Sequence, residues 1–349
     1  MSLPGPIVSA RAWVSDHPLW SAVIAGGLLR LVNVAFGFGW FALDDYVYVV
    51  EPAWRWLADP TLPYPSALRS ELLARAVSMC MAMARALGAE DPATVLRVVY
   101  SLLGLWSVAA IPAVYHLTRR RLGDDAARYA AWLMAAYALM PLISTRALIE
   151  VVAVVPLCWG LVLVDAGDEG TARRRLLMTA GGAICLGVAA MVRFQVGLLW
   201  LAALGWLVWR ATVRRPDERA TERWASVGGL LAGGLVALFV AGTADVAGGR
   251  PFMGTVWAYV RFNVGNPERF GTSAWYTYVL QIVAYTAPPA TLWLARPLWR
   301  TFRAHLLVGT GLTSFILVHS VIGHKEDRFL FSVLPLVFVL LGGALAEIR

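Results

Sequence analysis

Charge is scarce in this chain of 349 residues. Only 15% of the residues are charged, against about 25% in an average soluble domain, and 59% are hydrophobic. The mean hydropathy is +0.64. Apolar stretches of roughly 17–25 residues, each long enough to cross a bilayer as a helix, recur along the whole length. The composition argues against an ordinary soluble enzyme and predicts an all-α, polytopic membrane protein.

Cysteine and several sequence signatures are rare or missing. The three cysteines, Cys80, Cys158 and Cys185, show no CxxC pairing, which favours buried hydrophobic side chains over a metal site or a disulfide framework. No Gly-rich phosphate loop and no Rossmann pattern occurs, so a nucleotide-bound donor in the cytosol is unsupported. No internal repeat is present, and residues 1–17 lack the pattern of a cleavable signal peptide.

Ten membrane spans can be drawn, and we expect them to form one domain over residues 1–349. They cover about 19–38, 94–117, 129–145, 149–165, 176–193, 196–212, 226–247, 279–295, 306–322 and 329–346. The loops between them alternate in charge. Four basic clusters share one face: Arg119–Arg121 with Arg128, Arg173–Arg175, Arg210–Arg223 and Arg296–Arg303.

The positive-inside rule puts that basic face, and with it both termini, in the cytoplasm. The net charge of +8 is then attributed to topology signals and contacts with membrane lipids, and not to a nucleic-acid site. Lys325 is the only lysine among 30 basic residues, and no N-x-S/T sequon is present. Both features favour a bacterial plasma membrane over the ER membrane of a eukaryote.

Two long loops lie on the opposite, exoplasmic face. The first, residues 39–93, has apolar residues at helical spacing over Tyr46–Leu57 and Leu68–Leu87. This spacing predicts amphipathic helices that lie along the membrane surface. The second loop, residues 248–278, is rich in aromatic residues, Gly and Asn.

Unusual polar residues gather on the exoplasmic face. A hexapeptide between two strongly apolar runs has the sequence His324-Lys325-Glu326-Asp327-Arg328-Phe329. Charge at the rim of a bilayer is costly, which makes this segment a candidate functional site. In the second loop, Trp275 and Tyr276 are typical of an interfacial aromatic belt, and together with Asn263 they would also suit a sugar ring.

Adjacent carboxylates, Asp44 and Asp45, follow the first span. They are either the polar start of a helix, where carboxylates are favourable, or a general base and its partner. Glu51 lies about two turns further on, and it shares their face if a helix starts at Asp44. Two adjacent acidic residues could also bind a divalent cation, although no cofactor is required.

Arginines near the same face also have two interpretations. Arg146 and Glu150 have the spacing of a local helical ion pair, and Arg193 is placed to extend toward lipid headgroups. Alternatively, these cations and the carboxylates displace a phosphate leaving group together. Arginine binds phosphate through parallel hydrogen bonds, while a carboxylate takes the proton from an attacking hydroxyl.

Five segments resemble, in order along the chain, the signatures of one known family. Residues 324–336 resemble the H-K-E-x-R-F-L-x-P-x-L-P-L motif of the Alg9-like mannosyltransferases, glycosyltransferase family 22 of the GT-C class. The other four resemble the family's D-E-x-x-Q-x-x-E-x-A, L-R-S, S-R-T-L and F-N…Y-G-x-x-P-W-H-W segments, at 44–53, 68–70, 144–148 and 262–276. Ala42-Leu43 stands where the family has His-Pro, and Ser332 stands where it has Pro.

The resemblance implies a GT-C bundle and an inverting transfer of mannose from polyprenyl-phosphate mannose to a glycolipid or glycan. Asp44 would be the general base, with Asp45 or Glu51 orienting it or binding acceptor hydroxyls. The expected donor and acceptor contacts are His324, Lys325, Glu326, Arg328, Arg69, Arg146, Arg193, Asn263, Trp275 and Tyr276. Two alternatives stay open: transfer of another sugar, such as glucose or an aminopentose, and a transporter or flippase for lipid-linked sugars. A transporter is expected to carry ionisable residues at the midplane of repeated halves, and this sequence lacks that pattern.

Overall fold

The computed structural model describes residues 12–213, 218–265, 271–286 and 290–349, and within these ranges it contains helices and no strand. The helices are α2 (Pro18–Phe36), α3 (Leu43–Asp45), α4 (Glu51–Arg55), α5 (Leu72–Ala86), α6 (Pro92–Val108), α7 (Ala110–Leu122), α8 (Asp124–Ala136), α9 (Leu139–Ile143), α10 (Ile149–Val152), α11 (Val154–Ala166), α12 (Ala172–Val192), α13 (Gly197–Thr212), α14 (Ala220–Ala247), α15 (Gly254–Gly265), α16 (Thr277–Tyr285), α17 (Ala290–Trp293), α18 (Ala295–Ala304), α19 (Leu306–Val321) and α20 (Leu334–Glu347). A π-helix, Tyr46–Val50, joins α3 to α4, and 3-10 helices cover Phe194–Val196 and Asp327–Val333. The expected all-α fold is confirmed.

Seven helical segments in the described ranges are long and apolar enough to cross a membrane, and α18 with α19 makes an eighth if this pair, bent by 113°, is one span. The segments are Pro18–Phe36, Pro92–Leu122, Ile149–Ala166, Ala172–Val192, Phe194–Thr212, Ala220–Ala247 and Asp327–Glu347. The sequence analysis predicted about ten spans. The predicted spans 129–145 and 279–295 do not form continuous helices of spanning length, and residues 287–289 of the second lie outside the described ranges.

Pro141 explains why the predicted span 129–145 is interrupted. A proline has no N–H for the carbonyl four residues earlier, and its ring clashes with that carbonyl. Four residues before Pro141 is Tyr137, where the backbone leaves the helical region after α8 has ended at Ala136. The result is a short α9 in place of the last turns of a membrane span.

Arg30 fills the gap that this break leaves. Its guanidinium is fully buried within the bundle and donates to the carbonyl oxygens of Met134 and Ala135, at 3.3 and 3.2 Å. These carbonyls belong to the last turn of α8 and have no partner within that helix. Arg30 also donates to Ser107 Oγ at 2.6 Å, so it joins α2, α6 and α8. The charge inside the first span is therefore accounted for by hydrogen bonds.

Glycines allow α12 and α14 to pack with their backbones close together. A Cβ on Gly229 would lie 2.2 Å from the carbonyl oxygen of Leu176, and one on Gly233 would lie 2.2 Å from that of Ala180. The two glycines are four residues apart and therefore share one face of α14. Small residues at this spacing are typical of helix pairs inside membranes, where close packing replaces the hydrophobic effect.

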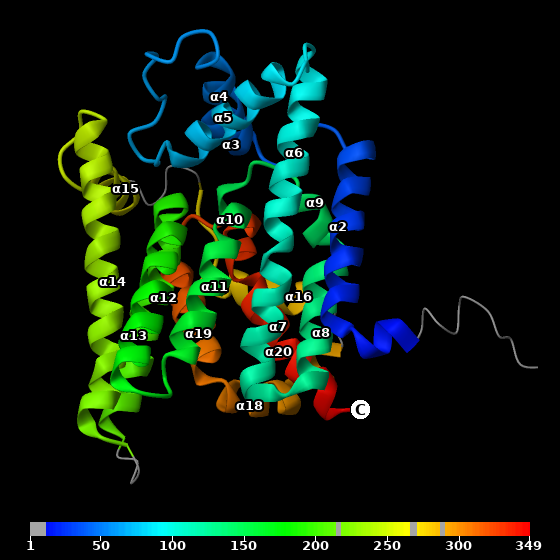
Figure 1. The fold of residues 1–349 in the computed structure, drawn as a ribbon, viewed down its shortest axis with the longest axis vertical. Helices are drawn as coiled ribbons and strands as arrows, with labels where there is room; N and C mark the ends of the chain where they lie inside the picture. Colours follow the sequence, from blue (N-terminus) through cyan, green and yellow to red (C-terminus); the bar gives the residue numbers. More distant parts are fainter. Residues whose placement is uncertain (1–11, 214–217, 266–270, 287–289) are drawn as a thin grey trace, which may run out of the picture.

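The two ends of the bundle differ. α3, α4, α5 and α15 cover one end, while α2 begins, and α20 ends, toward the other (Figure 1). α18 and the connections from α7 to α8 and from α11 to α12 also lie at that second end. The polar loops and the basic clusters are thus separated along the bundle axis, as charge alternation predicted. Residues 1–11 and 214–217, which include part of the predicted basic face and the N-terminal segment without a signal pattern, lie outside the described ranges.

The basic end is held together by ion pairs. Asp165 is fully buried and pairs with Arg120 and Arg121, at 3.0 and 2.7 Å. Asp168 pairs with Arg121 and Arg210. These contacts link the end of α7 to α11 and α13. Several arginines that the sequence analysis assigned to topology and lipid headgroups therefore also join helices.

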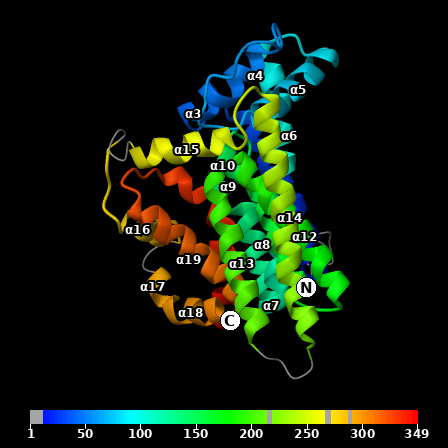
Figure 2. The same ribbon diagram turned by 90° about the vertical axis from the view of Figure 1, so that its left-hand side faces the viewer.

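The first long loop contains helices, as predicted, but at shorter bounds. α5 runs from Leu72 to Ala86 and buries Leu73, Val77 and Met81 at four-residue spacing against α6 and α4. The expected helix over Tyr46–Leu57 is a π-helix that continues into α4. α15, in the second long loop, runs across the bundle axis instead of along it (Figure 2).

Candidate active site

Asp44 lies where three distant parts of the chain meet. It sits in α3, directly after the first span, and its Oδ2 accepts hydrogen bonds from Arg69 Nη2 at 2.6 Å and Arg328 Nη2 at 2.5 Å. Arg69 precedes α5, and Arg328 belongs to the 3-10 helix that leads into α20. One carboxylate therefore holds together the first loop and the hexapeptide, which are 284 residues apart in sequence.

The hexapeptide continues this network. Arg328 Nε donates to Glu326 Oε2 at 2.5 Å, and His324 Nε2 lies 2.9 Å from Glu326 Oε1. Opposite charges thus alternate from Arg69 through Asp44 and Arg328 to Glu326, and His324 lies against the second oxygen of Glu326. Charge-assisted hydrogen bonds of this kind are roughly twice as strong as neutral ones, so the network fixes the side chains at the cavity wall.

A cavity of about 440 Å³ opens beside the network. Its lining combines the five network residues with aromatic, hydroxyl and aliphatic side chains: Asp44, Tyr48, Val49, Tyr64, Ser66, Leu68, Arg69, Ser70, Leu73, Ile149, Val192, Arg193, Phe194, Gln195, Tyr259, Phe262, Asn263, Ile322, His324, Glu326, Arg328 and Phe329. The volume lies within the range of about 300–1,000 Å³ that small-molecule sites occupy.

Electrostatics keep the two network carboxylates ionised. Burial raises the pKa of Asp44, but the guanidiniums of Arg69 and Arg328 outweigh it and hold that pKa below its usual value. Burial likewise raises the pKa of Glu326, and its hydrogen bonds with Arg328 and His324 lower it to below the ordinary value. Both groups are therefore anions at neutral pH, and an ionised carboxylate is the form that accepts a proton.

Glu150 lies behind the cavity wall. Its side chain is fully buried, and Oε1 is 3.3 Å from Nη2 of Arg193. The guanidinium of Arg193 also stacks on the ring of Phe329, at 4.7 Å from the centroid. Ser332, which replaces the family's proline, donates to the backbone carbonyl of Glu150 at 3.0 Å. The predicted pair of Glu150 with Arg146 is replaced by the pair with Arg193.

α15 covers one side of the cavity with Tyr259, Phe262 and Asn263. The three positions share a helical face because they are three and four residues apart. Asn263 Nδ2 donates to the carbonyl oxygen of Tyr259 at 2.8 Å, and the residue lies at the cavity wall. Burial raises the pKa of Tyr259. The second loop thus contributes to the site through α15.

Two predicted acidic residues lie outside the cavity. Asp45 is buried and turns back to accept from the backbone N–H groups of Phe41 and Ala42, at 3.1 and 3.2 Å. It therefore has the role of a helix cap, the structural alternative considered from the sequence. Glu51 is the first residue of α4 and does not line the cavity either.

Four other predicted contacts also point elsewhere. Lys325 Nζ donates to the carbonyl oxygens of Ile322 and Ser273, at 2.6 and 3.1 Å, and thereby ties the hexapeptide to the second loop. Arg146 is buried, donates to Thr145 and stacks on the ring of Tyr100. The rings of Trp275 and Tyr276 contact each other edge to face and are largely exposed. Phe270, from the same predicted motif, lies outside the described ranges.

The sequence analysis missed several cavity residues. Tyr64, Ser66 and Ser70 come from the irregular stretch between α4 and α5, where no periodicity marks a side chain as inward-facing. Tyr64 is oriented by a hydrogen bond from its hydroxyl to the carbonyl oxygen of Tyr48, at 2.9 Å. Gln195, which lies at a break between two spans and two residues after Arg193, carried the clearest signal, since polar residues inside membrane segments are costly.

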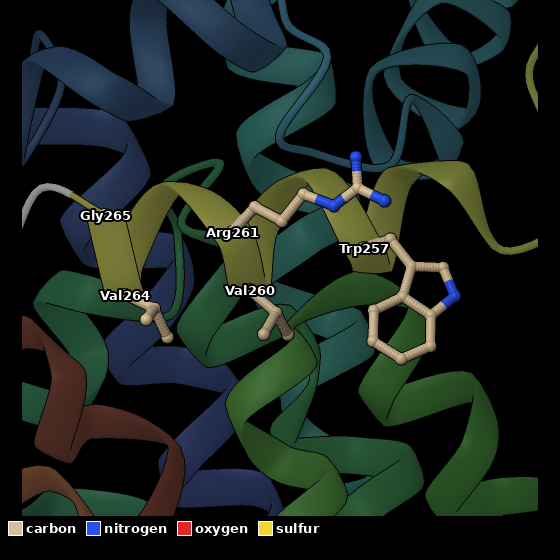
Figure 3. Close-up of a pocket in the computed structure, with 5 residues that line it drawn as sticks. All are labelled: Trp257, Val260, Arg261, Val264 and Gly265. Carbon is tan, nitrogen blue, oxygen red and sulfur yellow. The ribbon is translucent and has the colours of Figure 1, made fainter.

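Two other hollows differ in chemistry from the cavity. One, of about 510 Å³, is formed by α15 alone, from Trp257, Val260, Arg261, Val264 and Gly265. In Figure 3, Arg261 extends away from the side of α15 that carries Val260 and Val264, so its polar groups do not converge there.

The other hollow is an apolar groove of about 340 Å³ between α12, α13 and α14, and it is lined by residues such as Ala190, Trp200 and Ala241. Phe194 lines both the groove and the polar cavity, so the two adjoin at this residue. A polar site and an apolar groove are therefore neighbours.

Among the described residues, no group of three or more His, Cys, Asp or Glu side chains has the arrangement of a metal site. The acidic residues that face the cavity, Asp44 and Glu326, are each bonded to Arg328. The chemistry available at this site is therefore that of arginines facing a carboxylate.

Comparison with known proteins decides the family. A model of the Alg9-like mannosyltransferase family matches residues 59–349. The chain belongs to this family. The match includes the hexapeptide and Arg69, whereas Asp44 precedes it. Among curated protein sequences, none matches this chain.

The fold is that of GT-C membrane glycosyltransferases. ArnT from Cupriavidus metallidurans, solved bound to undecaprenyl phosphate, has a TM-score of 0.66 and 13% identity over 97% of this chain and 61% of ArnT. The Archaeoglobus fulgidus oligosaccharyltransferase, solved tethered with an acceptor peptide, has a TM-score of 0.55 and 12% identity over 97% of this chain and 50% of that enzyme. At such identities the likeness shows the fold alone. It confirms the predicted GT-C bundle, and the apolar helices of spanning length support an integral membrane protein.

Proposed function

We propose that this Alg9-like protein is an inverting glycosyltransferase that moves mannose from a polyprenyl-phosphate donor to a hydroxyl group of a glycolipid or glycan. The observation that carries the proposal is the cavity in which Asp44 faces Arg69, Arg328 and Arg193. Family membership supports glycosyl transfer. ArnT, whose structure holds undecaprenyl phosphate, supports a polyprenyl-linked donor.

The reaction assigns a role to each wall of the cavity. The acceptor oxygen attacks C1 of the sugar, the bond from C1 to the phosphate oxygen breaks, and polyprenyl phosphate leaves with the electron pair. Arg69, Arg328 and Arg193 stabilise the charge that the phosphate gains, and His324 assists them. The hydroxyl proton passes to Asp44 as general base. No metal takes part in this scheme.

The lowered pKa of Asp44 constrains the timing. Any carboxylate is a weak base toward an alcohol, and one whose pKa is held down by guanidiniums is weaker still. Proton transfer to Asp44 therefore comes late, after the bond from the sugar to phosphate has largely broken and the hydroxyl has become acidic. This order favours a transition state with positive charge on the sugar, in which stabilisation of the leaving phosphate matters most.

The apolar groove supports a lipid-linked donor. It adjoins the cavity at Phe194 and is lined almost entirely by apolar side chains of α12, α13 and α14. We assign it to the isoprenoid units nearest the donor phosphate. The phosphate would then lie against the arginines while the chain leaves between helices toward the lipid.

We place the cavity on the periplasmic side of a bacterial plasma membrane, with both termini in the cytoplasm. The support is electrostatic. The basic clusters Arg119–Arg121, Arg173–Arg175 and Arg296–Arg303 lie at the end of the bundle opposite to α5 and α15. Basic residues favour the cytoplasmic side of a membrane. Accessibility of single cysteines introduced at Glu71 and at Arg300 to a membrane-impermeant thiol reagent would test this assignment.

Sugar transfer by the purified protein in detergent tests the function. Synthetic polyprenyl-phosphate mannose is supplied with a membrane glycolipid extract, and released polyprenyl phosphate is measured. Loss of a general base lowers the rate of a reaction by about 10²–10⁴-fold, so we expect the transfer rate of Asp44→Asn to be lower than that of the wild type by this factor. Asp59→Asn removes a carboxylate of the same loop that accepts hydrogen bonds from Thr61 and does not line the cavity, and it is expected to keep the wild-type rate.

Two results would refute the proposal. Transfer by Asp44→Asn at the wild-type rate would remove Asp44 as the base. Movement of lipid-linked sugar across liposomes, with no polyprenyl-phosphate sugar ever consumed, would favour the transporter instead. The corresponding glucose and aminopentose donors, compared with the mannose donor at equal concentration, identify the sugar.

A further inference from the structure

Asp44 occupies the place of an anion between two arginines. A single oxygen atom, Oδ2, accepts from both Arg69 and Arg328. A carboxylate engaged in this way points its most basic oxygen at guanidiniums instead of at a substrate hydroxyl. In the structure described here, the proposed base is therefore masked by the residues proposed to bind phosphate.

Other contacts hold the arginines in place independently of Asp44. Arg328 keeps its Nε on Glu326 Oε2, and only its Nη2 is used for Asp44. The guanidinium of Arg69 stacks on the ring of Tyr48, at 4.3 Å from the centroid. If Asp44 let go, both guanidiniums would stay at the cavity wall with free N–H groups.

Arg193 is fixed from behind in a similar way. Its pair with the buried Glu150 and its stacking on Phe329 leave it on the cavity wall without any contact to Asp44. Three guanidiniums are thus anchored on the protein side by Glu326, Tyr48 and Glu150. Guanidinium groups bind phosphate through parallel hydrogen bonds, for which a phosphate offers more oxygens than Oδ2 alone.

We propose that the phosphate of a polyprenyl-linked donor displaces Asp44 from Arg69 and Arg328, and that this exchange uncovers the base. The inference rests on the proposed function and adds an order of events: the lipid phosphate binds first, and Asp44 then turns to the acceptor hydroxyl.

The exchange makes an unusual prediction for binding. If Asp44 competes with the lipid phosphate for the same N–H groups, Asp44→Asn binds polyprenyl phosphate more tightly than wild type, by about tenfold, because its two charge-assisted hydrogen bonds to Arg69 and Arg328 become weaker bonds to a neutral amide. Arg69→Gln, which removes one of the contested donors, binds it about tenfold more weakly.

The experiment measures the dissociation constant of sugar-free polyprenyl phosphate for the full chain in detergent, for example by quenching of intrinsic tryptophan fluorescence. Polyprenol without phosphate and inorganic phosphate are run in parallel. Polyprenol is expected to bind wild type and Asp44→Asn equally, which assigns the difference to the phosphate. Tightening for inorganic phosphate alone would identify a free-phosphate site and overturn the role of the lipid.

Glu71→Gln is the matched control. Glu71 lies at the same end of the protein, pairs with Arg75 at 3.4 Å and does not line the cavity. Its neutralisation removes the same charge without freeing Arg69 or Arg328, and we expect affinity within about twofold of wild type because a surface ion pair is weak and screened. Equal tightening in Glu71→Gln and Asp44→Asn would reduce the effect to net charge and overturn the exchange.

The binding test separates this inference from the proposed function. If wild type transfers sugar but Asp44→Asn binds polyprenyl phosphate no more tightly than wild type, the exchange is wrong and the enzyme stands. If Asp44→Asn binds more tightly but no donor sugar is ever consumed by wild type, the arginines form a lipid-phosphate site and the proposed transfer is wrong. Weaker binding by Asp44→Asn would mean that Asp44 positions the arginines, which also overturns the exchange.

Discussion

Arg69→Gln offers a test of how the site controls its base. Burial raises the pKa of Asp44, and the coulombic effect of Arg69 is the largest of those that lower it. Arg69 Nη2 lies 2.6 Å from Asp44 Oδ2, and about a quarter of the Arg69 side chain is exposed, so the substitution leaves no deeply buried gap. The variant therefore removes a positive charge that lies beside the base, with little disturbance to packing.

The sign of the effect follows from the role of Asp44. A general base works in its ionised form, so activity is present above its pKa and is lost as the pH falls through it. In the wild type that loss occurs below the usual carboxyl range because the pKa is lowered. Removal of Arg69 leaves the effect of burial opposed by Arg328 alone. An opposite charge at close range shifts an Asp pKa by about 1–3 units. The acid limb of the pH–rate profile, where activity is lost as the pH falls, is therefore expected to move to higher pH by at least about one unit.

The assay is kcat/KM for donor consumption between about pH 2 and pH 8, a range that includes the wild-type acid limb, because this ratio reports the pKa values of the free enzyme. Arg75→Gln is the control. Arg75 is on α5 near Arg69, pairs with Glu71 and stacks on Trp56, and it has no contact with Asp44. An acid limb that stays in place in Arg69→Gln, or that moves equally in Arg75→Gln, would refute the electrostatic account of Asp44.

Three further predictions concern the groove, the interior and the hexapeptide. Ala241→Phe, which fills the apolar groove, is expected to raise KM several-fold for a long-chain polyprenyl donor but not for a two-isoprene donor, measured by the same assay. Arg30→Leu leaves the carbonyls of Met134 and Ala135 buried and unpaired, and each unpaired carbonyl costs about 1–3 kcal/mol of stability. The thermal stability of this variant in detergent should therefore be well below that of the exposed-site variant Arg75→Gln. Lys325→Met removes two bonds to backbone carbonyls and should cost about 1–3 kcal/mol of stability while lowering transfer far less than Asp44→Asn; a loss of transfer as large as that of Asp44→Asn would show that Lys325 contacts the donor.

The sequence predicted the architecture where the physical signal is long-range and averaged. Hydropathy identified the membrane helices, and charge alternation separated the basic loops from the polar site. It overcounted spans where a single proline interrupts a helix, as at Pro141, because a hydropathy window does not register one lost hydrogen bond. Arg30 lies within the predicted span 19–38, and the structure shows which groups its guanidinium bonds there.

Within the site, three residues that the sequence analysis selected from motifs lie together. These are Asp44, Arg69 and Arg328, and they meet although they are separated by up to 284 residues. The sequence did not distinguish the roles of adjacent residues. Asp44 and Asp45 are adjacent, yet one faces arginines and the other caps the backbone of Phe41 and Ala42. That difference depends on how the three-residue helix α3 turns, and a helix this short leaves no repeating pattern of apolar residues in the sequence.

The same argument applies within the hexapeptide and explains why Lys325, the single lysine of the chain, does not line the cavity. In the extended segment before the 3-10 helix, alternate side chains point to different sides, so His324 and Glu326 line the cavity while Lys325 turns to the second loop. In the first turn of the 3-10 helix, Arg328 lines the cavity while Asp327 bonds to Gln281. The two-residue spacing is that of an extended chain. The hexapeptide therefore has two functions, which its amino-acid sequence alone does not distinguish. One set of side chains holds the charges of the site, and the alternate set fastens that segment to its neighbours, which is what keeps Arg328 within 2.5 Å of a carboxylate from the other end of the chain.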